Sequence, residues 1–513
     1  MQDSGKSPEQ RLVERRHPDH AANLEHHQFL RATYDGGPAY AKDNLFKYPA
    51  EPARGYTARK KRAVPSAISR GIIEAYVGYL LKEAPQLAEN VPPCIEQFVG
   101  NCDGEGTPLI KLARTVATWA LTYGTVWLCV DKGQHNTDRE LSAAEEIAEG
   151  RYPYCQWFLT TAVLDGKMES GEVEWLLVQE DGRDDDDPMT STGEPIVRYR
   201  LWERNRIRCW REAKAQDGSQ HLILESDIPN ALGRVPFVSI QIGEGSPWAA
   251  PGLVSDIAYI EREIYNLQSQ LSEILAKVTF PQLRYPLTGG AGSADAKRVL
   301  TIGLDSVIPY AAEPGNPGPD YLAPPSGPAQ EIRTSIDALK HASYLLALLD
   351  GEMTASIKNN STGLASGVSK AFTFEKLNKR LSVLADTFEQ AWLQVFKLVC
   401  LWQKVDPETL PADAWDWPDN FEVRSLADDI AEVVNVMAAS PPSGKLKAAL
   451  WIGLARRMFP KMSQDEFDEI VVEIETACEN ELMGMGAHLL QANEPGETSE
   501  AELADEMTGP AEG

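Results

Sequence analysis

The hydrophobic positions of the chain predict three long amphipathic helices. In residues 255–279, apolar side chains recur at alternating steps of three and four, which is the spacing of one face of a helix. Similar stripes run through residues 328–350 and, from Phe374 to Trp402, through a third segment. At 1.5 Å per residue the first helix would be roughly 37 Å long, which exceeds an ordinary globular helix. We expect the first two helices to pair antiparallel. The stripe of the first contains Ile257, Ile260, Ile264, Leu267, Leu271, Ile274 and Val278, and that of the second contains Ile332, Ile336, Leu339, Leu346 and Leu349.

A sheet is predicted ahead of these helices. Residues 63–84 and 109–121 have helical spacing, but between residues 122 and 242 the pattern changes to short runs of Val, Trp, Leu and Ile separated by Gly and Asp clusters. Such runs are typical of strands joined by turns. We therefore predict a mostly antiparallel sheet whose strands lie at 125–130, 174–179, 196–203, 221–224 and 237–242.

The connections between the long helices differ in composition. Residues 281–327 are too many for a turn, and the runs at 299–302 and 306–310, among Gly and Pro, predict a small β-rich knob. Gly351 is expected to stop the second helix. Residues 352–367 are rich in Ser, Thr, Asn and Gly, which favours a mobile loop.

The two ends of the chain are predicted to be less regular. Residues 1–62 are polar, with breakers at 36–38 and 49–52, and are expected to form an arm that lies on something else. A short strand is expected at 420–423, followed by a helical bundle at 426–438, 444–458 and 463–490. No Lys or Arg follows Lys461, and residues 493–513 are expected to be a disordered acidic tail. The predicted fold class is therefore α+β.

Composition narrows the possible functions. With 513 residues, 43% of them hydrophobic and 24% charged, the chain should form more than one core. A formal charge of -27 excludes phosphate-backbone binding as the dominant activity, because such binding needs clustered Lys and Arg. Seven widely spaced cysteines without a C-x-x-C pair suit a reducing cytoplasm. No signal peptide or membrane helix is expected, so we expect the chain to be soluble and intracellular.

The sequence contains no recognisable catalytic motif. The segment Gly289-Gly290-Ala291-Gly292 lacks the Lys and hydroxyl of a phosphate-binding loop, and neither H-E-x-x-H nor G-x-S-x-G occurs. We therefore predict no catalytic, cofactor-binding or metal-ligating residue. The acidic run 184–187 is expected to be a solvated hairpin tip in preference to a cation site. The clustered histidines are expected to be surface residues of a flexible arm, since Pro18 would break a helix that aligned them, and they are His17, His20, His26 and His27.

One basic run stands out in this acidic chain. It contains Arg54, Arg59, Lys60, Lys61 and Arg62, interleaved with Tyr56. One interpretation is a solvated linker. The other is an electrostatic contact made by residues 59–62, either with DNA phosphates or with a carboxylate-rich surface of an adjacent copy.

The order of the predicted elements resembles that of tailed-bacteriophage portal proteins. The resemblance covers about residues 25–490, and its closest segments are Ser246-Pro247-Trp248, Leu253-Val254-Ser255-Asp256-Ile257-Ala258, Glu263-Ile264-Tyr265-Asn266, Phe280-Pro281, Leu322-Ala323-Pro324-Pro325-Ser326-Gly327 and Ser366-Gly367-Val368-Ser369-Lys370. It implies an N-terminal arm (1–62), an α/β wing (63–250), a descending stem helix (251–280), a clip (281–327), an ascending stem helix (328–350), a channel loop (351–367), a long helix with a wing return (368–425), a helical crown (426–492) and the acidic tail (493–513).

The resemblance also implies a function. A portal is a ring, usually of twelve copies, at one capsid vertex of the virion, assembled in the bacterial host cytoplasm. Double-stranded DNA passes through it without sequence specificity during packaging and ejection. The terminase large subunit and later the head-completion, adaptor and tail proteins dock on the clip, and capsid proteins surround the ring. It is not an enzyme, binds no cofactor and touches no membrane.

Site residues follow from the resemblance by position. The channel loop would face DNA through Lys358, Asn359, Asn360, Ser361 and Thr362. The stem would contact neighbouring subunits through Ile257, Ile260, Ile264, Leu267, Leu271, Ile274, Ile332, Ile336 and Leu339. A mostly negative channel wall would let the duplex slide. Two alternatives stay open: a soluble α+β enzyme whose active site is not identified, and a helical scaffold or adaptor without a channel.

Overall fold

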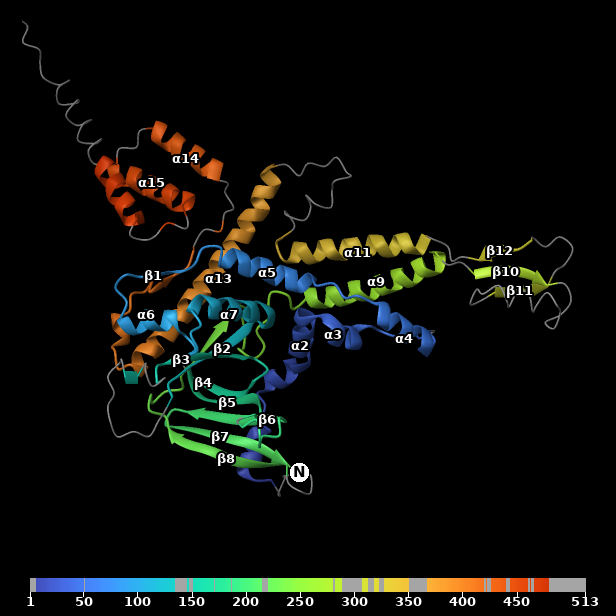
Figure 1. Cartoon of the computed structure of the whole chain (residues 1–513), viewed down its shortest axis with the longest axis horizontal. Coiled ribbons are helices and arrows are strands. Elements are labelled where there is room, and N and C mark those ends of the chain that lie inside the picture. The colour runs from blue at the N-terminus through green and yellow to red at the C-terminus, as the bar shows by residue number, and fades with distance from the viewer. Residues whose placement is uncertain are drawn as a thin grey trace, which may run out of the picture. The chain divides into compact units, whose positions relative to one another are not determined.

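The chain is an α+β protein made of two compact units, Met1–Phe421 and Glu422–Gly513 (Figure 1). This computed structural model describes residues 6–49, 51–133, 145–146, 151–169, 171–185, 187–214, 220–279, 282–287, 307–311, 318–322, 327–349, 367–418, 421, 426–439, 443–459, 462 and 466–478. The predicted channel-loop residues 358–362, the strand at 299–302 and the acidic tail at 493–513 lie outside the described residues.

The largest core of the first unit is built from helices. Helices α5 (Ile68–Leu80), α6 (Pro93–Gly100), α7 (Leu109–Tyr123) and α13 (Gly367–Trp402) surround one cluster of buried side chains. The stripe predicted for the third long helix forms the α13 side of this cluster, with Leu381, Phe388 and Trp392 fully buried. The indole N–H of Trp402 donates to the carbonyl of Val130 at 2.8 Å, which ties the end of α13 to the adjoining sheet.

Two antiparallel sheets follow α7, where the sequence predicted one. The first has the order β3-β2-β9, from β3 (Tyr154–Leu159), β2 (Thr125–Asp131) and β9 (Phe237–Gln241). The second is a five-stranded meander of β4 (Val163–Glu169), β5 (Glu172–Arg183), β6 (Pro195–Glu203), β7 (Arg206–Lys214) and β8 (Gln220–Pro229). A second core cluster contains Trp127 of β2, Trp202 of β6 and Phe237 of β9, together with Trp248. The antiparallel prediction is confirmed, while β3, β4 and β7 were not foreseen.

A close crossing fixes the start of the next long helix. Gly124 ends α7 with φ +86°, and a Cβ there would lie 2.0 Å from the carbonyl oxygen of Ala250. The N–H of Leu253 donates to the carbonyl of Leu121 at 2.8 Å, and the indole N–H of Trp248 donates to that of Val163 at 2.8 Å. Only glycine fits this backbone contact without strain.

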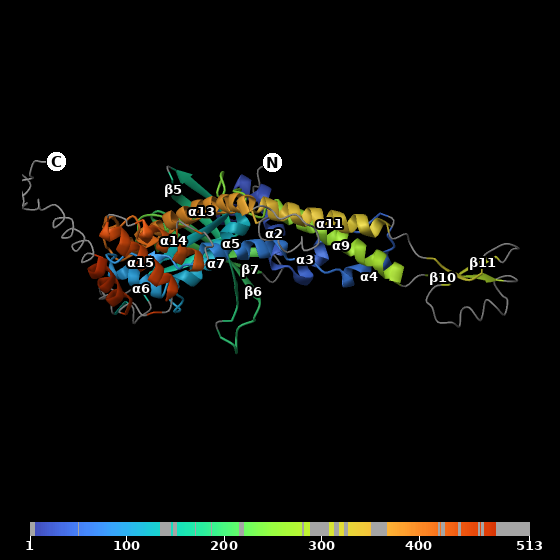
Figure 2. The same cartoon turned by 90° about the horizontal axis from the view of Figure 1, so that it is seen from above.

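The predicted antiparallel helix pair is present. Helix α9 (Ile257–Thr279) and helix α11 (Gly327–Leu346) pack along each other, and both views show them side by side (Figure 1 and Figure 2). Between them in the chain lies a three-stranded sheet of β10 (Gln282–Leu287), β11 (Val307–Ala311) and β12 (Asp320–Leu322), in which β10 is central, parallel to β11 and antiparallel to β12. The prediction of Gly351 as the stop was wrong: α11 ends at Leu346, and Leu348 adopts φ 56°.

The first 62 residues are more regular than their polar sequence indicated. They contain α1 (Pro8–Val13), α2 (Pro18–Asp35), α3 (Gly37–Asn44) and α4 (Ala53–Arg62). The breakers mark helix boundaries, because Gly36 ends α2 with φ 64° and Pro38 lies in the first turn of α3, where its missing N–H costs nothing. These helices pack on the rest of the first unit, with α2 against α5 and α7 and α4 against α9.

The segment after α13 carries the turn η1 (Pro407–Thr409) and a strand, β13 (Trp415–Asp416), which pairs with β1 (Gln86–Leu87). The strand expected at 420–423 is not seen at Phe421; its other residues lie outside the described ones. The second unit contains α14 (Leu426–Ala438) and α15 (Gly444–Met458), which pack together, and residues 466–478 are helical. Ser443 caps α15 by accepting from the N–H of Leu446.

Candidate functional site: the α9–α11 helix pair, its anchors and a cleft

The apolar stripes of α9 and α11, together called the seam, pack against other parts of the same chain. Ile257 and Ile264 of α9 and Ile336 of α11 are buried in the main core cluster. The remaining seam residues are half-buried, and most of them pack against the same cluster: Ile260, Leu267, Leu271, Ile274, Ile332 and Leu339. Within the single chain these side chains therefore pack mainly between the two helices and against the main core cluster. Their predicted contact with neighbouring subunits stays a prediction.

A buried carboxylate joins α9 to α5. Glu261 is 1% exposed, and its oxygens accept from the backbone N–H groups of Ile68 at 3.1 Å and Ser69 at 2.8 Å. The residue before α5, Ala67, has no side chain that could cap the helix, so Glu261 satisfies these N–H groups from outside. Burial raises the pKa of Glu261.

Helix α4 is held against α9 by Arg59. The Arg59 guanidinium pairs with the Glu51 carboxylate at 2.7 Å, donates to the Ser269 hydroxyl of α9 at 3.2 Å, and also donates to the carbonyl of Phe46. Its Cζ lies 4.7 Å from the centre of the Tyr48 ring. The hydrogen bond from Arg59 lowers the pKa of Glu51. Arg59 is 2% exposed, so neither DNA nor another copy can reach it.

The other members of the basic run are closer to solvent. Arg62 pairs with Glu273 of α9, and Lys60 donates to the carbonyl of Lys42. Lys61 is exposed. The carboxylate contact foreseen for this run thus exists, but Arg59 and Arg62 make it within their own chain.

The four N-terminal histidines differ from the prediction. Pro18 is the first residue of α2 and does not break it, so His20, His26 and His27 share one helix. His20 and His27 are buried, where His20 Nε2 lies 3.1 Å from the carbonyl oxygen of Thr161. Burial lowers the pKa of both, that of His27 to about 4. Among the described residues no group of His, Cys, Asp and Glu is arranged to hold a metal ion.

The acidic run at 184–187 lies at the tip of the β5–β6 hairpin. Asp184 accepts from the N–H and hydroxyl of Thr192 at 3.0 and 2.7 Å. Asp187 accepts from the N–H of Met189 at 2.9 Å and the hydroxyl of Thr190 at 2.8 Å. These two carboxylates therefore close the turn, in line with the predicted hairpin tip; Asp186 lies outside the described residues.

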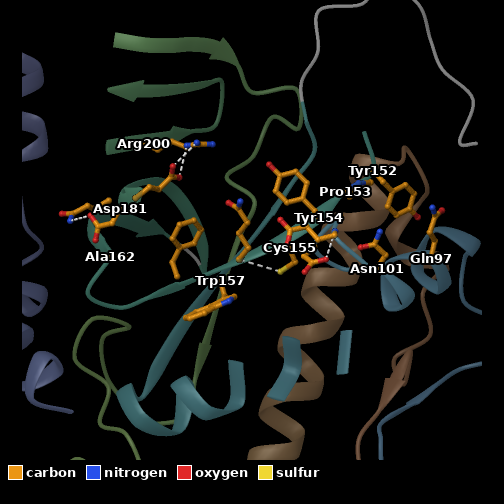
Figure 3. Close-up of a pocket in the computed structure, with 17 residues that line it drawn as sticks. Gln97, Asn101, Tyr152, Pro153, Tyr154, Cys155, Trp157, Ala162, Asp181 and Arg200 are labelled. Atoms are coloured by element: carbon orange, nitrogen blue, oxygen red, sulfur yellow. Dashed lines mark hydrogen bonds and ion pairs between the residues drawn. The ribbon is translucent and has the colours of Figure 1, made fainter. Parts of the chain in front are cut away.

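A cleft of about 850 Å³ lies beside β3 (Figure 3). At one side Arg200 of β6 pairs with Glu180 of β5 at 3.0 Å, and the hydroxyl of Tyr154 donates to Asp131 at 3.2 Å. Burial raises the pKa of the Cys155 thiol, which keeps it protonated and a weak nucleophile. The sequence did not indicate this cleft, because its lining is scattered over 97–200: Gln97, Asn101, Asp103, Gly104, Glu105, Tyr152, Pro153, Tyr154, Cys155, Gln156, Trp157, Phe158, Ala162, Gln179, Glu180, Asp181 and Arg200.

Comparison with known proteins finds similarity to chains of gene transfer agent particles among solved structures. No protein-family model and no curated protein sequence matches the chain. Among solved structures, it is similar to a chain of the virion of a native gene transfer agent particle, with 10% identity and a TM-score of 0.34 over 72% of this chain and 87% of that one. It is also similar to a chain of the neck of an empty gene transfer agent particle computed with C6 symmetry, with 11% identity and a TM-score of 0.35 over 80% and 89%.

Identities and TM-scores this low leave the function to be argued from the chain's own residues. Within the part of the chain that the structure describes, no helix is both long enough and apolar enough to cross a bilayer.

Proposed function

We propose that the chain is the subunit of a portal ring, a conduit for double-stranded DNA at one vertex of a tailed-phage-like particle. The observation that carries this proposal is the antiparallel α9–α11 pair, anchored by Glu261 and Arg59 and interrupted by a small three-stranded sheet. In this proposal the pair is the stem, β10–β12 belong to the clip and the sheets β2–β9 belong to the wing. A compact enzyme rarely needs such a projecting helix pair, whereas a ring with an axial stem does.

A closed ring requires two different surfaces on each subunit that complement each other. With the seam used internally, the apolar side chains left exposed on the stem are the candidates for this contact. They include Leu275 of α9, which is 42% exposed, and Leu345 of α11, which is 55% exposed. We propose that the stems of adjacent copies bury these residues.

The clip offers a docking surface. Tyr321 and Leu322 of β12 are exposed, beside an ion pair in which Arg284 of β10 holds Asp320 at 2.9 Å. Exposed apolar side chains on a short edge strand suit partners that bind in succession. We propose that the terminase large subunit and then head-completion proteins dock here, and that the loop residues 358–362 meet the passing DNA.

Light scattering coupled to size-exclusion chromatography tests ring formation. The wild-type chain should form a closed oligomer, and Leu345→Glu should give a folded monomer because a charge cannot be buried at the contact. Met189→Glu is the matched control, since Met189 is 89% exposed at a hairpin tip far along the chain from the stem. Equal assembly of both variants would remove Leu345 from the contact.

A second experiment tests the channel loop. Deletion of residues 358–362 should leave rings intact but impair packaging or retention of DNA in particles. Normal packaging by this deletion variant would withdraw the assignment of these residues.

A further inference from the structure

Two cysteines face each other where α6 packs on α13. Phe98 of α6 and Phe396 of α13 meet edge to face, with ring centres 6.2 Å apart and an interplanar angle of 86°. Cys94 lies four residues before Phe98, and Cys400 lies four residues after Phe396. Four residues are about one helical turn, so each cysteine lies one turn away from the phenylalanine of its own helix, on the face that contacts the other helix.

The two thiols are in direct contact. The Cys94 and Cys400 side chains form a hydrogen bond with each other. Cys400 belongs to the main core cluster, and the partly buried Cys94 packs against it. Tyr152 lies over the pair, and its hydroxyl donates to the carbonyl of Cys94 at 2.6 Å. A disulfide needs side chains that point at each other with Cβ atoms about 3.5–4.5 Å apart, and facing thiols in contact meet the directional part of this requirement.

The members of the pair have different access to solvent. Cys94 is half-buried in the first turn of α6, whereas Cys400 is fully buried. The hydrogen bond with Cys400 lowers the pKa of the Cys94 thiol, while the same bond raises that of Cys400. Cys94 is therefore the thiol that an external oxidant meets first, in its more reactive form.

Other buried cysteines lack this arrangement. Cys102 and Cys155 are close, since the N–H of Cys155 donates to the carbonyl of Cys102 at 2.7 Å. Their thiols nevertheless point to backbone carbonyls, that of Cys102 to Thr107 at 3.2 Å and that of Cys155 to Gln156 at 3.8 Å. This second pair provides an internal comparison.

We propose that Cys94 and Cys400 are an oxidation site at which a small-molecule disulfide closes a covalent link between α6 and α13. The Cys94 thiolate attacks one sulfur of the oxidant, forms a mixed disulfide and expels one thiolate. The Cys400 sulfur then attacks the Cys94 sulfur and expels the second thiolate, which takes up the Cys400 proton as it leaves. Two protein thiols and one disulfide thus become one protein disulfide and two small thiols, with two electrons passed to the oxidant. The site does not depend on the proposed portal function.

Peptide mapping of the reduced full-length chain treated with glutathione disulfide tests this proposal. The expected product is a chain lighter by two hydrogen atoms, in which the Cys94 peptide is linked to the Cys400 peptide. Cys400→Ser should stop at one glutathione on Cys94, because the resolving thiol is gone. Cys94→Ser should leave Cys400 unmodified.

The double variant Cys102→Ser/Cys155→Ser is the matched control and should link Cys94 to Cys400 as the wild type does. Two results would overturn the proposal: free Cys94 and Cys400 after treatment, or linkage of Cys102 to Cys155 in their place. Peptide mapping detects both outcomes whether or not the chain forms rings. A failure of this proposal can therefore be told apart from a failure of the proposed portal function.

Discussion

The carboxylate of Glu261, on the long helix α9, accepts a hydrogen bond of 2.8 Å from the backbone N–H of Ser69 in the first turn of α5. A charged group taken out of water is stable only when it is paired or hydrogen-bonded. Here the helix N-terminus supplies both the N–H donors and a favourable dipole. This contact joins the first part of α9 to the N-terminus of α5.

Loss of the Glu261 cap should destabilise the first unit. Glu261→Ala leaves the N–H groups of Ile68 and Ser69 buried without an acceptor, at a cost of roughly 1–3 kcal/mol in the free energy of unfolding. Glu261→Gln keeps one acceptor oxygen and should lose less. Urea unfolding at neutral pH measures both, and equal stability of Glu261→Ala and wild type would contradict the capping role.

The raised pKa of Glu261 also gives a pH signature. The Glu261 carboxyl keeps its proton to higher pH in the folded chain than in the unfolded chain, where its pKa has the ordinary value of 4.5. Its contribution to stability is fully present below 4.5 and is lost as pH rises through the folded pKa. Glu261→Gln should remove this component from the stability profile measured between pH 4 and 7, and an unchanged profile would argue against it.

His27 should make the chain sensitive to acid in the opposite sense. Its pKa falls from 6.5 to about 4 because it is buried, with lesser effects from His26 and His20. The contribution of neutral His27 to the free energy of unfolding is fully present above pH 6.5. It is lost as the pH drops toward 4, by about 3 kcal/mol at most. His27→Phe, packed on Tyr123, should flatten this loss in urea unfolding at pH 7.5 and 5.

The control for the histidine prediction is His221→Phe, at an exposed position of β8. It should leave the acid sensitivity as in the wild type. If both variants lose stability on acidification as the wild type does, His27 is not the group responsible.

The seam of the helix pair should matter to the single chain and not only to its assembly. In a Leu345→Glu background, which keeps the chain monomeric in this account, Ile264→Ala should cost about 2–5 kcal/mol, because Ile264 is fully buried. Leu275→Ala on the same helix should cost well under about 1 kcal/mol in that background. A seam between subunits would show the reverse: little loss of monomer stability at Ile264.

Arg59 should be the one structural member of its basic run. Arg59→Ala leaves the partly exposed Glu51 carboxylate without its ion-pair partner and should lower the free energy of unfolding by about 1–3 kcal/mol, the usual cost of leaving a hydrogen-bonding group without its partner. Lys61→Ala, at an exposed neighbouring position, should change stability by less than about 0.5 kcal/mol. Thermal unfolding of both variants tells a structural arginine from a solvated linker.

The strongest periodic patterns predicted the fold best. The stripes of α9, α11 and α13 are long, and each spacing is repeated enough to fix both the helix and its buried face. Strand β7 was missed although Arg206 and Arg208 alternate with apolar residues, because the run is short and rich in arginine; carboxylates of other segments, such as Asp227 and Glu203, pair with these arginines in the fold. A single segment cannot display partners that distant parts of the chain supply.

The same limit explains the errors at the N-terminus. The buried faces of α2 and α4 include His20, His27 and Arg59, which are polar residues that hydrophobic patterning counts as exposed. Their partners, Thr161, Glu51 and Ser269, come together only in the folded chain. The antiparallel pairing of α9 and α11 was predicted, but the burial of Ile264 and Ile336 in the core of the same chain became evident only in the structure.

The central claim is that copies of this chain close into a ring around a channel for duplex DNA. Electron microscopy of the purified full-length chain, with class averages viewed along the axis, tests it most directly. The account predicts a closed ring, of about twelve copies in the family it resembles, with an axial opening wide enough for the duplex and the α9–α11 pairs around it. Persistent monomers, open filaments or a closed assembly without an axial opening would contradict it.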